Sequence, residues 1–139
     1  MSSFLSAAAS GGGAAGGHFE LVERDTGRVL VPHLEIAGDS ASRRRGLLGR
    51  DGLPDGAALA IAPTNAVHTF FMRFPIDIVF VTRAGRVLKV REAVPAWRIA
   101  VGPGAYAVVE LAAGGAVRAG IVPGLHVVAR RAVPGVTSR

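Results

Sequence analysis

The chain has 139 residues, of which 50% are hydrophobic and 19% charged, a composition that predicts one globular domain and excludes an intrinsically disordered chain. It contains no cysteine, which excludes disulfides, thiolate-bound zinc, iron–sulfur clusters and cysteine nucleophiles. The net charge of +6 comes almost wholly from arginine, since Lys89 is the only lysine, and it favours an anionic partner without identifying one.

The basic residues are spread along the chain, and their one cluster is Arg43-Arg44-Arg45. Nucleic-acid-binding surfaces concentrate basic residues and place aromatic residues among them. Here the aromatic residues gather in an apolar run instead, so the pattern argues against a nucleic-acid partner. No run of about 18 or more apolar residues occurs, so we expect no membrane span.

Residues 1–17, MSSFLSAAASGGGAAGG, lack the basic start and the long apolar stretch of a signal peptide. We therefore expect a flexible Ala/Gly/Ser tail over residues 1–17, a single β-sandwich domain over 18–131 and a frayed C-terminus over 132–139. The cytoplasm is the expected compartment, and export stays open as an alternative.

The first predicted elements form a hairpin. Phe19 to Glu23 alternates apolar and polar residues, which predicts a half-buried strand. The turn Asp25-Thr26-Gly27 leads to a second strand, Arg28 to Ile36. Pro32 cannot donate a hydrogen bond to a ladder, so this strand is expected at an edge of the sheet or interrupted at Pro32.

A short helix is predicted next, over Ala41 to Leu48. Asp39 or Ser40 can cap its N-terminus, and Gly49 suits its C-terminal end. The three arginines of its later turns fit the negative end of the helix dipole, which is a structural reason for the cluster.

Further short strands are expected at 57–62, 78–82, 86–93, 105–111 and 126–130, with a loop over 95–104 and one helical turn ending at 118. The strands 78–82 and 86–93 form a hairpin around Ala84-Gly85. The sum is seven or eight short strands with one or two short helices. It predicts an all-β fold, either a compact β-sandwich or a jelly-roll-like small barrel.

The most apolar and aromatic run is 67–81, VHTFFMRFPIDIVFV. If it is a strand, the adjacent Phe70 and Phe71 point to opposite faces, so both faces are covered. We expect Phe70, Phe71 and Met72 in the core. Trp97 lies in a Pro-flanked loop, and we expect it to be partly exposed and to contact a partner.

Five ionisable residues lie in or beside these apolar motifs, where a charged group needs a partner: Arg45, His68, Arg73, Asp77 and Glu110. In a structural interpretation, the two carboxylates accept hydrogen bonds from backbone N–H groups or arginines and fix the helix and loops to the sheet. In a functional interpretation, His68 and an arginine bind an anionic ligand in a shallow cleft. If the protein is an enzyme, His68 is the general base, and Asp77 or Glu110 orients it.

Other kinds of site have no support in the sequence. There is no G-x-S-x-G nucleophile motif and no G-x-x-x-x-G-K phosphate loop. The four histidines are dispersed without ligand spacing, so we expect no metal and no other cofactor. The sequence does not determine the function. The leading hypothesis is a non-enzymatic binding or accessory module. The alternative is a small anionic-ligand binder or enzyme that uses His68 with Asp77 or Glu110, and a third hypothesis is an anionic surface bound by Arg43 to Arg45. The expected partner is thus a protein or a small anionic ligand.

Several motifs occur in a fixed order: RGLLGR at 45–50, VHTF-x-M at 67–72, PID at 75–77, GRV at 85–87 and VEL-x-x-G at 109–114. This set resembles the bacterial and archaeal domain-of-unknown-function family 192. The chain departs from that family's pattern at Leu48, where Met is frequent, and at Gly124-Leu125, where Gly-Asp is frequent. The resemblance implies an all-β, jelly-roll-like domain, no assigned activity, and relatives that are often exported.

Overall fold

Short apolar segments form nearly all of the regular structure in the computed structural model, which describes residues 4–5 and 18–132. Its strands are β1 (Phe19–Glu23), β2 (Val29–Ala37), β3 (Ala57–Ile61), β4 (Ala66–His68), β5 (Ile76–Val81), β6 (Val87–Val94), β7 (Ile99–Val101), β8 (Ala107–Ala112) and β9 (Val127–Arg131). Its helices are α2 (Ser40–Arg45) and α3 (Gly115–Ala119).

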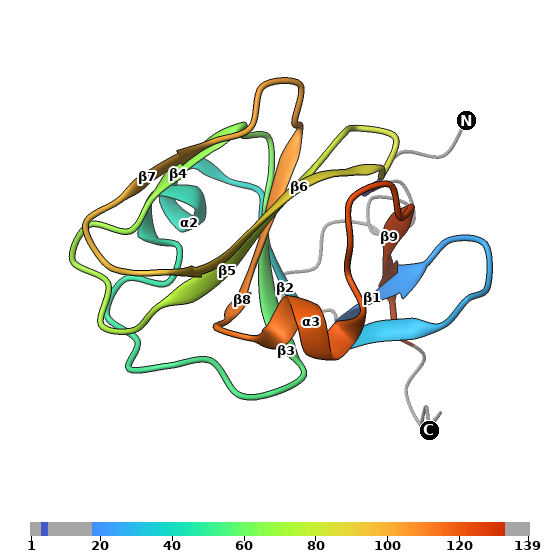
Figure 1. Cartoon of the computed structure of the whole chain (residues 1–139), viewed down its shortest axis with the longest axis horizontal. Helices are drawn as coiled ribbons and strands as arrows, with labels where there is room; N and C mark the ends of the chain where they lie inside the picture. Colours follow the sequence, from blue (N-terminus) through green and yellow to red (C-terminus); the bar gives the residue numbers. More distant parts are fainter. Residues whose placement is uncertain (1–3, 6–17, 133–139) are drawn as a thin grey trace.

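Seven strands form one mixed sheet in the order β6-β5-β8-β3-β2-β1-β9, and β4 pairs with β7 in a small antiparallel sheet (Figure 1). The predicted all-β class with short helices is confirmed, and the sheets are not closed into a barrel. None of the described helices has the length and apolar character that crossing a bilayer requires.

The central strands β5 and β8 are covered on both faces, and their side chains alternate between two hydrophobic clusters. Val79 and Val109 belong to one cluster, with residues of β1, β2, β9 and α3. Ile78, Phe80 and Val108 belong to the other, which includes residues next to α2 and in β7. Each side of the sheet therefore has its own core, and a residue's position in β5 or β8 decides which core it faces.

The crossover between β2 and β3 carries α2 to one face of the sheet. These two strands are parallel, so the chain between them must return along the sheet, and it forms α2 on the way. Figure 1 shows α2 beside β4 and β7 on one side of the molecule and α3 on the other. This arrangement brings the arginine cluster next to β4.

The strands of both predicted hairpins pair as expected. β5 pairs with β6, and β1 pairs with β2, in antiparallel fashion. β2 is not at an edge, because it lies between β3 and β1. It also runs unbroken through Pro32, where only its register with β1 shifts, between the pairs Phe19↔Leu34 and Leu21↔Val31.

Two boundaries differ from the sequence prediction for local reasons. α2 ends at Arg45, because Gly46 adopts a positive φ of 46° that breaks the helix before Gly49. The strand considered for Phe70 and Phe71 ends before them, because β4 ends at His68 and a turn follows. Phe71 lies in that turn and is 71% exposed, so the prediction that it packs in the core is wrong. The predicted loop 95–104 contains β7.

Phe4 reaches the core from the segment predicted to be a tail. Its side chain is fully buried in the cluster shared by β1, β9 and α3. Its N–H donates to the carbonyl of Arg83 (2.6 Å), and its carbonyl accepts from the N–H of Ala129 (3.0 Å). The remainder of the predicted tail and the predicted frayed C-terminus beyond residue 132 lie outside the described residues.

Candidate functional site

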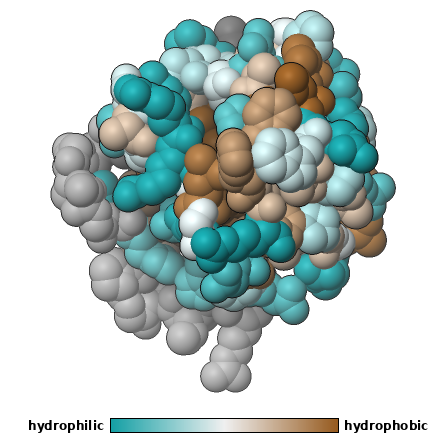
Figure 2. Space-filling model, turned by 90° about the vertical axis from the view of Figure 1, so that its left-hand side faces the viewer, coloured by the Kyte–Doolittle hydropathy of each residue, from teal (hydrophilic) through white to brown (hydrophobic). Residues whose placement is uncertain are grey.

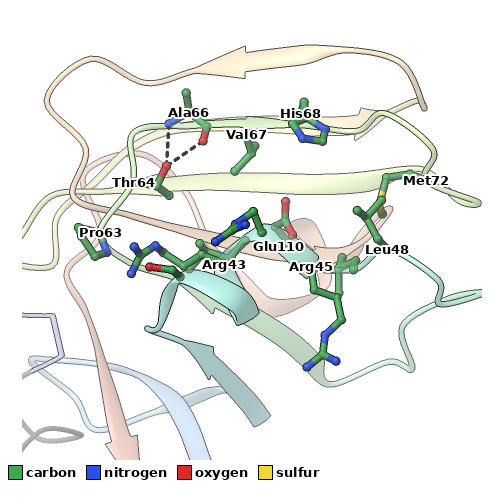
Figure 3. Close-up of a pocket in the computed structure, with 15 residues that line it drawn as sticks. Arg43, Arg45, Leu48, Pro63, Thr64, Ala66, Val67, His68, Met72 and Glu110 are labelled. Carbon is green, nitrogen blue, oxygen red and sulfur yellow. Dashed lines mark hydrogen bonds between the residues drawn. The ribbon is translucent and has the colours of Figure 1, made fainter.

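A cavity of about 450 Å³ lies between α2, β4 and the part of β8 that carries Glu110 (Figure 3). Its walls combine basic and apolar side chains with a single carboxyl group. The lining residues are Ser40, Arg43, Arg44, Arg45, Gly46, Leu47, Leu48, Ile61, Pro63, Thr64, Ala66, Val67, His68, Met72 and Glu110. Two sequence-predicted site residues besides Glu110 therefore belong to it: Arg45 and His68.

The α2 wall is fixed at both ends of the helix. The backbone N–H of Ser42 donates to Asp39 Oδ1 (2.8 Å), which caps the N-terminus and holds the pKa of Asp39 below its ordinary value. Leu47, just after the helix, is buried in the cluster that contains Ile61. Because α2 buries no residue of its own, its arginines are free to face the cavity or the solvent.

The three arginines of α2 differ in what they contact. Arg43 Nη1 donates to the carbonyl of Gly38 (2.5 Å), in the segment between β2 and α2. One of its donor groups is therefore already used. The guanidinium groups of Arg44 and Arg45 make no hydrogen bond or ion pair to any described residue. The guanidinium of Arg45 points away from Glu110 (Figure 3). Arg44 is therefore as good a candidate for binding an anion as Arg45.

Glu110 occupies the middle of the main sheet. Its backbone pairs with Ile78 of β5 on one side and Leu59 of β3 on the other, so its nearest cross-strand neighbours are aliphatic. Glu110 is 4% exposed. Figure 3 shows the carboxyl group directed into the space between α2 and β4.

The carboxyl group of Glu110 makes no hydrogen bond or ion pair with any described residue. Burial raises its pKa to about 7, and the positive charge of Arg50 opposes that rise only in part. Arg50 is itself ion-paired with Glu35 (2.6 Å). A buried acid without a partner destabilises a fold, and such groups concentrate at functional sites.

The opposite wall comes from β4 and the residues before it. Thr64 Oγ1 donates to the carbonyl of Ala66 (2.8 Å) and accepts from its N–H (3.3 Å), which fixes the approach to the strand. His68 is exposed, and its ring stacks on Phe70 at 4.8 Å between centroids. Its Nδ1 accepts from the N–H of Phe70 (3.3 Å), which leaves the proton of the neutral ring on Nε2 as a donor.

Asp77 lies on the other face of the sheet from Glu110. Its strand position pairs with Leu111, whereas Glu110 pairs with Ile78, so the two carboxylates point to opposite sides. Asp77 is fully buried, and it accepts from the N–H of Ala93 (2.8 Å) and of Ala116 (2.9 Å). Through these bonds it connects β6 and α3 to β5, and it makes no bond to His68.

Arg73 and Trp97, the other predicted site residues, do not line the cavity. Arg73 Nη1 lies 2.8 Å from Asp51 Oδ1 on the surface. Trp97 is 57% exposed, so the prediction of partial exposure is confirmed. His68, Asp77 and Glu110 are not assembled into one constellation, because the sheet separates Asp77 from the other two.

Thr64 and Leu48 line the cavity although the sequence did not single them out as site residues. Thr64 could have been suspected, because Pro63-Thr64-Asn65 breaks the chain directly before β4. No signal in one sequence shows that α2 packs opposite this break. Among the described residues, no three His, Asp or Glu side chains are close enough to hold a metal ion.

Comparison with known proteins agrees with this fold. A crystal structure of a protein of unknown function from Novosphingobium aromaticivorans DSM 12444 is similar, with 27% identity, 79% of this chain and 82% of that chain covered, and a TM-score of 0.64. A second structure, from Sinorhizobium meliloti 1021, is provisionally described as a transcription regulator. It shares the fold at 21% identity and a TM-score of 0.67, with 80% of this chain and 91% of that chain covered.

No curated protein sequence matches the chain. The family DUF192, described as an uncharacterized group, matches residues 21–129, which include the cavity and most of β1 and β9. The resemblance read from the ordered motifs is therefore confirmed. The chain belongs to the DUF192 family.

Proposed function

We propose that the chain is a binding module for a small organic anion that also carries a hydroxyl or amino group. The anion would lie against the arginines of α2, and the donor group would reach Glu110. The observation that carries the proposal is the buried, unpartnered carboxyl group of Glu110 on the floor of a cavity with basic walls.

The charges around the cavity support an anion. Three arginines and one histidine line it, against one carboxyl group. An arginine guanidinium binds a carboxylate or phosphate through two parallel hydrogen bonds, and His68 Nε2 adds a further donor at the rim. The volume of about 450 Å³ suits a small molecule and not a folded partner.

The apolar part of the lining supports an organic ligand over an inorganic ion. Ile61, Val67 and Met72 face the same space as the arginines. An inorganic phosphate or sulfate would leave this surface in contact with water, whereas a ligand with a short carbon skeleton would cover it.

An enzyme that acts on the same anion is the second candidate, because Glu110 with a pKa of about 7 can both accept and donate a proton at neutral pH. His68 with Asp77 is a weaker pair for this task, since Asp77 hydrogen-bonds to two backbone N–H groups on the other side of the sheet. Turnover of a bound ligand, followed by NMR, would separate this candidate from simple binding.

The test is a thermal-shift screen of hydroxy acids, amino acids and sugar phosphates, followed by calorimetric titration of the compounds that stabilise the chain. Arg44→Gln should weaken binding about tenfold or more, because a charged hydrogen bond contributes about 1.5–3 kcal/mol. Glu110→Gln should weaken binding of compounds with an amino group most, because the amide has no negative charge to offer them.

Arg73→Gln is the matched control, because it removes the same charge from an exposed ion pair outside the cavity. It should leave the affinity unchanged. Equal losses in Arg44→Gln and Arg73→Gln would show that only net charge matters. A screen without any stabilising compound would contradict the proposal.

A further inference from the structure

Four large apolar side chains form an exposed surface next to the cavity. They are Phe71 (71% exposed), Trp97 (57%), Ile99 (62%) and Val101 (45%), and we call them the apolar platform. Ile99 and Val101 lie on β7, and the aromatic pair lies in the two turns beside the small sheet. Figure 2, which views the side of the molecule with α2, β4 and β7, shows apolar side chains across its centre and hydrophilic ones around them.

Buried polar contacts hold the aromatic end of the platform in position. Thr69 is 1% exposed, and its Oγ1 donates to the carbonyl of Pro95 (2.7 Å) and accepts from the N–H of Arg98 (2.9 Å). Its carbonyl accepts from the N–H of Trp97 (3.0 Å). These bonds join the turn after β4 to the turn before β7, so both turns act as one support.

Phe71 and Trp97 have strained backbones, with positive φ values of 62° and 68°. A bulky residue in this region costs on the order of 1 kcal/mol or more, and such strain persists where the surrounding structure imposes it. Their rings contact each other at 4.6 Å between centroids. The fold therefore uses strained turns to present two aromatic rings to the solvent.

Cations border the platform at two places. The segments 66–74 and 95–102 contain no acidic residue, and among the described residues the one outside carboxylate that pairs with them is Asp51, which lies 2.8 Å from Arg73. Arg98 Nη1 donates to the carbonyl of Trp97 (3.4 Å), and Lys89 Nζ donates to the carbonyl of Val101 (2.9 Å). Each end of the platform thus carries a cation held by a platform carbonyl.

We propose that the apolar platform docks on the surface of an anionic lipid bilayer. Phe71, Trp97, Ile99 and Val101 would enter the region between headgroups and acyl chains, while Arg98 and Lys89 would contact lipid phosphates. Aromatic and aliphatic side chains with a basic border have the chemistry of an interfacial membrane site. A second copy of the chain fits less well, because a two-fold contact between platforms would bring the Arg98 and Lys89 cations of the two copies together.

The experiment uses sedimentation of the full chain with vesicles of phosphatidylcholine, with and without phosphatidylglycerol. We expect binding to the anionic vesicles, weakened by salt, together with a blue shift of the emission of Trp97, the only tryptophan. Phe71→Asn with Ile99→Ser should lower the partition coefficient about tenfold or more, because two apolar side chains no longer enter the bilayer. Asn tolerates the positive φ of residue 71, so this variant should fold.

Arg98→Gln and Lys89→Gln should each lower binding to anionic vesicles about fivefold and leave binding to neutral vesicles unchanged. Val117→Ser with Val122→Ser is the matched control, since these valines are 68% and 55% exposed but lie outside the platform. It should bind as the unchanged chain does. The proposal is overturned if anionic vesicles leave the chain in the supernatant, if the control loses as much binding as the platform variant, or if the platform instead mediates a dimer that Phe71→Asn dissociates.

Discussion

Glu110 and Asp77 are two buried carboxylates of one domain with opposite effects on the stability of the fold. Asp77 uses both of its oxygens on backbone N–H groups and holds β6 and α3 against β5. Glu110 has no such partners, and its pKa is raised to about 7 by burial. The first residue stabilises the fold, and the second destabilises it whenever it is ionised.

Replacing Glu110 by glutamine is expected to stabilise the fold above neutral pH. The Glu110 carboxyl group keeps its proton up to about pH 7 in the folded chain but loses it near pH 4.5 in the unfolded chain. The protonated group therefore contributes fully to the free energy of unfolding below pH 4.5, and this contribution is lost as the pH rises through 7. The loss amounts to about 3 kcal/mol. Melting temperatures from about pH 5 to about pH 8 should fall more steeply for the unchanged chain than for Glu110→Gln. Parallel curves would contradict this account.

Asp77→Asn should destabilise the domain by about 2 kcal/mol, because the amide nitrogen would face a backbone N–H that needs an acceptor. Urea denaturation measures the change. Asp51→Asn, which alters an exposed ion pair with Arg73, is the control and should cost less than about 0.5 kcal/mol. If Asp77→Asn left stability unchanged and removed ligand binding, Asp77 would have to be reassigned to a site.

At the level of residues, the sequence identified the ionisable side chains that lie in apolar motifs, but it did not show which of them lie close together. Charges embedded in apolar motifs indicated Glu110 and Asp77. Their separation depends on the register of β5 against β8, and one step of register exchanges the faces. A single sequence holds no information on that register, so the joint role of His68, Asp77 and Glu110 could not be tested before the structure.

The small sheet of β4 and β7 is the element that both proposals share, because β4 lines the cavity and β7 carries part of the platform. β4 and β7 have three residues each, too few for a pattern of alternation to be read from the sequence. The segment 95–104 therefore looked like a loop. Longer elements with turn residues at their ends, such as the β5–β6 hairpin, were predictable because periodicity and turn chemistry agree there.

Thr69→Val should loosen the support of the apolar platform. The substitution removes the hydrogen bonds to Pro95 and Arg98 and leaves their backbone groups short of a partner, at a cost of about 1–2 kcal/mol. Acrylamide should then quench Trp97 fluorescence more strongly, and its anisotropy should fall. Thr64→Val, which removes bonds to Ala66 at an exposed position, should leave both readings unchanged. Equal changes in the two variants would show that the hydrogen bonds of Thr69 do not hold Trp97 in place.

At the scale of the molecule, one sheet separates two hydrophobic cores. The cluster that contains Phe4, Val79 and Val109 lies on the side of α3. The cluster that contains Ile78 and Phe80 lies on the side of the cavity and the small sheet. Composition and turn frequency could predict the all-β class, but the division into two cores follows from strand order, which the sequence alone did not supply.

Phe4→Ala should destabilise the whole domain by about 3 kcal/mol, because a fully buried phenylalanine is removed from the core. Urea denaturation of the full chain measures it. Phe71→Ala is the control, since Phe71 is mostly exposed, and it should change stability by less than about 0.5 kcal/mol. If the two substitutions had equal effects, Phe4 would not be part of the folded core.

The pairing of β1 with β9 joins the two ends of the described domain, and Ala132 N–H donates to the carbonyl of His18 (2.8 Å). During synthesis, β1 leaves the ribosome early and must wait with one edge unpaired until β9 follows, more than a hundred residues later. An unpaired strand edge invites association with other chains. A chain truncated before β9 would therefore be expected to aggregate. A circular permutant in which β9 directly precedes β1 would remove the delay between the synthesis of the two strands.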